Sequence, residues 1–156
     1  MFGKLNNEQI EQVIENNFVG RLACYADGRP YVVPISYAYE RGFIYVRTFE
    51  GMKINMMRKN PKVCFQIDEM ENMANWRSVV TWGTFEELTN EMDRNDALEK
   101  LVSRILPGIS TEMVKLSPQW PFPTDDFSKI KGIVFRIRIT EKTGRFESMN
   151  AIAFKR

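Results

Sequence analysis

The sequence contains no histidine among its 156 residues. Histidine is the commonest general base, proton shuttle and transition-metal ligand, so zinc enzymes, Ser-His-Asp hydrolases and His-ligated haem proteins are disfavoured. Only two cysteines occur, Cys24 and Cys64, each within an apolar strand-like run and in no CxxC pair. They predict buried free thiols in a reducing compartment. The chemistry that remains is that of carboxylates, lysine, tyrosine or a bound cofactor.

Long apolar runs and a strong net charge are also lacking. No stretch approaches the roughly 20 apolar residues of a transmembrane helix, and the N-terminal MFGKLNNEQIEQ turns polar too early for a signal peptide. We therefore expect no membrane association and a cytoplasmic location. The net charge of +2 provides no basic face of the kind that nucleic-acid binders show, so we expect no nucleic-acid partner.

Residue periodicity predicts a mainly β (α+β) protein, with one domain over residues 1–156. Short helices are expected at 6–17, 51–60 and 90–105. Six strands are expected, mostly antiparallel, at 21–26, 31–40, 43–48, 62–68, 76–88 and 132–144. So many antiparallel strands in a short chain favour a closed or nearly closed barrel, because closure removes exposed strand edges.

The expected strand 31–40 has an unusual face of small residues, formed by Pro34, Ser36 and Ala38. Proline cannot donate to a strand ladder, so Pro34 indicates an edge or a bulge. A low face with an irregular backbone would let a planar ligand lie close to main-chain groups. On this strand alone, the favoured interpretation is the alternative, a barrel strand whose small face is crowded by a neighbour.

Two further segments carry groups that bind anions. Thr48, Gly51 and Lys53 lie where an expected strand turns into a helix, which is a favourable place for a phosphate. Arg77 and Ser78 begin the long strand 76–88 and could supply a second cation and hydroxyl to the same anion. The alternative for the first segment is a capped surface helix with a solvated lysine.

Two single residues within strands add to this pattern. Gln66 is a polar side chain at a half-buried position of an otherwise apolar strand, where it needs a partner. Gly83, inside the strand 76–88, predicts a bulge or a close backbone approach.

The order of these segments resembles one family. V-P-I-S-Y, I-Y-V-R-T-F-E-G-M-K, R-K-N-P-K-V-C-F and W-R-S-V-V-T-W-G follow one another as in the FMN-binding split-barrel family of pyridoxamine 5'-phosphate oxidases, including its nitroimidazole-resistance reductase branch. The similarity spans roughly residues 8–145. It implies a six-stranded antiparallel split β-barrel with flanking short helices, of the FMN-binding type.

The resemblance also implies the site residues. The backbone of residues 33–36 would contact the isoalloxazine ring, and other side chains would hold the ribityl phosphate or lie near the ring edge. Trp120 would be a lid or interface residue over the flavin. The implied cofactor-binding residues are Val33, Pro34, Ile35, Ser36, Thr48, Gly51, Lys53, Gln66, Arg77 and Ser78.

Finally, the resemblance implies a homodimer with FMN at the subunit interface and an NAD(P)H-dependent oxidoreductase that acts on a small acceptor, for which nitroaromatic compounds are one class. Flavin hydride transfer often needs no protein acid or base, so no catalytic residue is assigned. The chain ends in FESMNAIAFKR, without the Arg- and His-containing signature of vitamin B6 oxidation. Three alternatives stay open: a flavin-binding carrier or sensor without turnover, a deazaflavin or similar cofactor in place of FMN, and a barrel that binds single-stranded nucleic acid.

Overall fold

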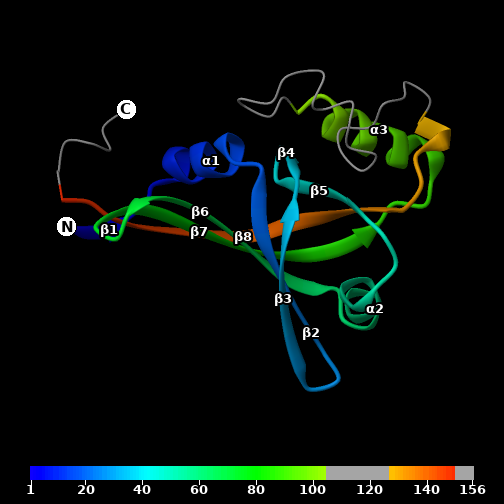
Figure 1. Ribbon diagram of the computed structural model, residues 1–156, viewed down its shortest axis with the longest axis horizontal. Coiled ribbons are helices and arrows are strands. Elements are labelled where there is room, and N and C mark those ends of the chain that lie inside the picture. The colour runs from blue at the N-terminus through cyan, green and yellow to red at the C-terminus, as the bar shows by residue number, and fades with distance from the viewer. Residues whose placement is uncertain (105–126, 150–156) are drawn as a thin grey trace.

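The computed structural model describes residues 1–104 and 127–149. Figure 1 shows a long twisted sheet, with α1 and α3 on one side of it and α2 beside β2. The helices are α1 (Asn7–Asn16), α2 (Met52–Lys59), α3 (Glu91–Val102) and a 3₁₀ turn η1 (Phe127–Lys129). The strands are β1 (Phe2–Lys4), β2 (Val19–Ala26), β3 (Arg29–Ser36), β4 (Ala38–Glu40), β5 (Phe43–Thr48), β6 (Lys62–Asn72), β7 (Asn75–Glu87) and β8 (Ile133–Glu147).

The helices begin and end where local side chains dictate. Asn6 and Gln9 form a capping box at the start of α1, each side chain accepting from the other residue's backbone N–H at 2.9 Å. Asn90 caps α3 by accepting from two backbone N–H groups. α2 ends directly before Asn60 and Pro61. Among the described residues, no helix is long and apolar enough to cross a membrane.

The sheet is a split barrel. Its strand order is β3-β2-β6-β7-β8-β5-β4, and β1 pairs with β8 beside this path. The two outermost strands, β3 and β4, are consecutive in the chain and separated only by Tyr37. The two edges of the sheet are therefore joined covalently but not by strand pairing. The mainly β, split-barrel class expected from the sequence is confirmed.

The prediction of one strand over 31–40 was wrong. The chain changes its pairing partner at Tyr37: β3 pairs with β2, whereas β4 pairs with β5. Tyr37 is 1% exposed, and its hydroxyl donates to the Ile14 carbonyl at 2.6 Å. The buried Tyr37 side chain anchors the point where the partner changes, and an alternating pattern does not reveal such a change. The sheet has eight strands rather than six, because β4 is a separate strand and β1 is too short for a periodic signal.

The core fills the space beneath the sheet. Val13 and Ile14 of α1, and Ile54 and Met57 of α2, are fully buried in one hydrophobic cluster with inward residues of the strands. A second cluster forms between α3 and the β4–β5 hairpin. Cys24 and Cys64 are both free thiols, as expected, and burial raises the pKa of each.

Candidate functional site

A hollow of about 500 Å³ lies between the edge strand β3 and the junction of β5 with α2; we call it the edge-strand pocket. One wall comes from β3, and the other comes from the segment that leaves β5 and enters α2. The sheet topology thus brings together two segments that are separate in the sequence. Its lining residues are Val33, Pro34, Ile35, Ser36, Arg47, Thr48, Phe49 and Lys53.

The β3 wall is open because β3 pairs with one neighbour only, β2. Backbone groups on the other side of an edge strand are not used by the sheet and can meet a ligand. Val33 and Ile35 pack against the core, whereas Pro34 and Ser36 are exposed. The small face predicted at Pro34 and Ser36 is therefore not crowded within one chain. Ala38, in β4, is buried in the second cluster instead.

The opposite wall carries positive charge. Lys53 lies in the first turn of α2, next to the hydroxyl-bearing Thr48. The Arg47 guanidinium is held 4.7 Å from the centre of the Phe49 ring, and its Nε donates to the Lys131 carbonyl at 2.7 Å. Burial and the positive charge of Arg94 lower the pKa of Arg47, so an anion in the pocket would relieve an unfavourable environment.

The lining chemistry fits a ligand that is flat at one end and anionic at the other. None of the eight lining residues is acidic, and none is a cysteine or tyrosine. Such a pocket can bind and orient a ligand through main-chain groups, hydroxyls and cations.

Gly51 lies between Thr48 and Lys53, directly before α2. It is the N-cap of α2 and makes no side-chain cap, and it lines a neighbouring hollow rather than the edge-strand pocket. A Cβ built on Gly51 would meet nothing within 4 Å, so the space beside this turn is open.

Three of the residues expected at the site do not line the edge-strand pocket: Gln66, Arg77 and Ser78. Gln66 donates through Nε2 to the Ser78 hydroxyl at 3.0 Å, which supplies the partner that its half-buried position requires. Gln66 pairs in register with Arg21, and Arg21 pairs in register with Pro34. Gln66 is therefore two strands away from the edge-strand pocket, about 10 Å at ordinary strand spacing.

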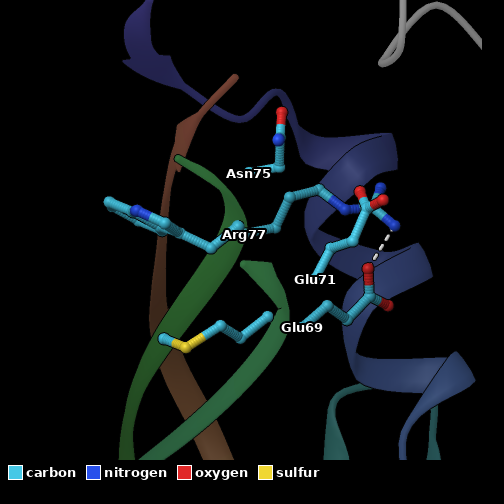
Figure 2. A pocket seen from close by; sticks show the side chains of 6 residues that line it. Glu69, Glu71, Asn75 and Arg77 are labelled. Carbon is cyan, nitrogen blue, oxygen red and sulfur yellow. Dashed lines mark hydrogen bonds and ion pairs between the residues drawn. The ribbon is translucent and has the colours of Figure 1, made fainter. Parts of the chain in front are cut away.

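Arg77 points in another direction. Figure 2 shows its side chain reaching toward α1 and meeting Glu69, with which it forms an ion pair. It lines a hollow of about 360 Å³ with Asn75, Trp76 and their neighbours. Successive strand residues alternate between the two faces of a sheet, so Arg77 and Ser78 do not converge on one anion within a single chain.

Trp120 lies outside the described residues. Sequence reasoning missed Arg47 and Phe49, although both lie in the quoted motif around Thr48 and Lys53. Arg47 and Phe49 flank Thr48 in the sequence, and this was the only signal for them. It did not show that the end of β5 faces the edge strand β3 across a pocket.

The chain belongs to the pyridoxamine 5'-phosphate oxidase family, whose model matches residues 6–146. A FAD-binding protein of Mesorhizobium loti has a similar crystal structure, with 32% identity, a TM-score of 0.69, and coverage of 95% of this chain and 99% of that chain. A candidate 5-nitroimidazole antibiotic resistance protein of Bacteroides thetaiotaomicron VPI-5482 shares the fold, with 18% identity, a TM-score of 0.72, and coverage of 94% of this chain and 87% of that chain.

Among curated sequences, an uncharacterised protein of Rhizobium meliloti (strain 1021) is 40% identical over 84 residues. The match covers 54% of this chain and spans 56% of the length of that relative.

Proposed function

We propose that this protein is a flavoprotein whose edge-strand pocket holds FMN. The observation that carries the proposal is the convergence of an edge-strand backbone at residues 33–36 with Thr48, Lys53 and Arg47 around one hollow. The related Mesorhizobium loti protein, described as FAD-binding, supports a flavin as the class of ligand.

In this arrangement the protein binds and orients the cofactor. The backbone of residues 33–36 would lie against the isoalloxazine ring, and Lys53, Thr48 and Arg47 would hold the phosphate. When bound, the flavin supplies hydride and electron transfer, for which the lining side chains need provide no acid or base. We propose that reducing equivalents come from NADH or NADPH and pass to a small acceptor, with nitroaromatic compounds as the first class to assay.

We also propose that the chain forms a homodimer through the outer face of its sheet. Val32, Ala23, Cys64 and Trp82 are paired in register across β3, β2, β6 and β7, and Val32 and Trp82 are 60% and 40% exposed. Ala23 and Cys64, between them, are half-buried. An apolar row that is exposed at both ends is typical of an association surface. A second copy on this face would bring its own Gln66 and Ser78 toward the edge-strand pocket.

The phosphate contact is tested by Lys53→Met. A charge-assisted hydrogen bond contributes about 1.5–3 kcal/mol, so FMN affinity should fall by about 10- to 150-fold while riboflavin affinity stays within about twofold. Lys4→Met is the matched control, because Lys4 is exposed on β1, at the opposite end of the sheet from α2 (Figure 1). Equal losses for FMN and riboflavin would contradict the phosphate assignment.

The redox role is tested by the visible spectrum of the FMN-loaded protein under nitrogen. Bleaching of the flavin bands on addition of NADH or NADPH is the expected result. Bands that persist would favour the alternative function, a flavin carrier or sensor without turnover. Failure to bind added FMN would refute the proposed function itself.

The dimer is tested by Trp82→Glu with sedimentation analysis. A buried carboxylate is costly, so the variant should sediment as a monomer while the wild-type protein sediments as a dimer. A wild-type monomer at micromolar concentration would contradict the proposal. The cytoplasmic location stays a prediction.

A further inference from the structure

A short chain of hydrogen bonds lies on the outer face of the sheet; we call it the polar network. Its members come from β2, β6 and β7 and are Arg21, Gln66, Asp68 and Ser78. Arg21 and Gln66 are paired in register, two residues along their strands from the apolar row that we propose as the dimer surface. Two residues of a strand span about 7 Å. A second copy that covers the apolar row therefore also covers the polar network.

The polar network fixes the orientation of the Gln66 amide. Its Nε2 donates to Asp68 Oδ1 at 3.1 Å and to Ser78 Oγ at 3.0 Å. A carboxylate can only accept hydrogen bonds, so the NH₂ end of the amide has to face Asp68. Arg21 forms an ion pair with the same carboxylate oxygen and holds it in place. The Gln66 carbonyl oxygen is therefore turned away from Asp68.

The network leaves one acceptor and one donor side by side. The Ser78 oxygen accepts from Gln66, so its own proton is directed elsewhere. Within residues 1–104 and 127–149, neither the Gln66 Oε1 atom nor the Ser78 proton has a hydrogen-bond partner. Both side chains are half-buried. A surface that covers them has to supply a donor and an acceptor, because unpaired buried polar groups are costly.

We propose that Asp68 is a positioning residue, which turns the Gln66 carbonyl outward so that Gln66 and Ser78 bind the imide edge of the isoalloxazine ring held by the partner subunit. The inference rests on the proposed function, with FMN in the edge-strand pocket and a dimer through the outer face. The imide edge presents N3–H, a donor, between two carbonyl acceptors. Gln66 Oε1 accepts from N3–H, and the Ser78 hydroxyl donates to a neighbouring carbonyl.

The ribityl hydroxyls of FMN also donate and accept hydrogen bonds. A hydroxyl rotates to suit its neighbour, so it requires no fixed amide orientation at Gln66. The imide edge is rigid and its pattern of donor and acceptors cannot change. The fixed orientation that Asp68 imposes therefore favours the imide edge as the group that is bound.

The test compares the binding of FMN and 3-methyl-FMN, in which a methyl group replaces the N3 proton, by flavin fluorescence. The wild-type protein should bind FMN at least about fivefold more tightly, because the methylated ligand leaves the Gln66 carbonyl unpaired. Gln66→Leu removes the acceptor and should reduce this preference to less than about twofold.

Asp68→Ala separates positioning from a structural role. Without the carboxylate, the Gln66 amide can present either end, so the preference for FMN should fall between those of the wild type and Gln66→Leu. Asp68→Asn keeps an acceptor at the same position and should keep the wild-type preference. Asp93→Ala, at an exposed position of α3, is the matched control. All variants are first shown to sediment as the wild type does.

Mixed dimers show which subunit supplies Gln66. One chain carries Lys53→Met and the other carries Gln66→Leu, and the mixed species is isolated with two different affinity tags. If Gln66 acts across the interface, both changes fall on one site, and the other site keeps wild-type affinity and preference. A titration that finds no wild-type site overturns the assignment to the partner's ring.

The remaining outcomes also decide the inference. Equal binding of FMN and 3-methyl-FMN by the wild type overturns it and leaves the proposed function intact. A preference that survives Gln66→Leu assigns the N3 contact to another group. A preference unchanged in Asp68→Ala removes the positioning role. A wild-type protein that binds neither ligand refutes the proposed function as well.

Discussion

Replacing Tyr37 by phenylalanine tests what anchors the junction between the edge strands β3 and β4. The Tyr37 hydroxyl donates to the Ile14 carbonyl at 2.6 Å, and both side chains are buried. Ile14 lies in the last turn of α1, where carbonyls have no partner within the helix. Removing the hydroxyl therefore leaves a buried acceptor unsatisfied, at a cost of about 1–3 kcal/mol.

The ring of Tyr37 should stay in place in the variant, because its edge-on contact with Phe65, at 5.2 Å between ring centres, does not involve the hydroxyl. The loss should therefore appear as a lower free energy of unfolding in urea with an unchanged slope. In a thermal scan, each kcal/mol corresponds to about 2–4 °C in Tm for a chain of this size.

The control is Tyr25→Phe, because Tyr25 is 52% exposed and its change should stay within about 0.5 kcal/mol. All variants are compared at one protein concentration and without flavin, since ligand and subunit binding also shift stability. If the free energy of unfolding of Tyr37→Phe lies within 0.5 kcal/mol of the wild-type value, the hydroxyl does not secure the β3–β4 junction and this reasoning is refuted.

Three further substitutions test packing, charge and capping. Gly20→Ala should destabilise by about 1–3 kcal/mol, because the new Cβ would lie 2.2 Å from the buried Phe65 ring; an unchanged urea midpoint would refute this. Hydrogen bonds from Arg58 lower the pKa of Glu87 from its ordinary value of 4.5, so Glu87 stabilises the fold above that pH and the contribution disappears as pH falls through the folded-state pKa. Glu87→Gln should therefore reduce the loss of stability on acidification below pH 4.5, and an identical pH profile would contradict the assignment. Asn90→Ala removes a cap that accepts from two N–H groups and should cost about 1 kcal/mol, measured by urea unfolding; no change would mean that solvent replaces the cap.

The local features were readable from the sequence because neighbouring residues determine them. Asp27-Gly28 and Arg41-Gly42 form the expected reversals, each with positive φ at both residues, as tight hairpin turns require. Gly83 marks a register irregularity in β7, where a Cβ would lie 2.5 Å from the Arg138 carbonyl oxygen.

Only the tertiary structure decided the order of the strands, and therefore which residues lie beside each candidate site residue. Period and turn signals fix which face a side chain occupies but not which strand becomes its neighbour. The change of strand partner at Tyr37 leaves β3 as an edge strand, and residues 33–36 lie across a pocket from Lys53. The same topology places Arg77 beside Glu69, away from that pocket. Sequence spacing could not distinguish these outcomes, because both depend on contacts between segments far apart in the chain.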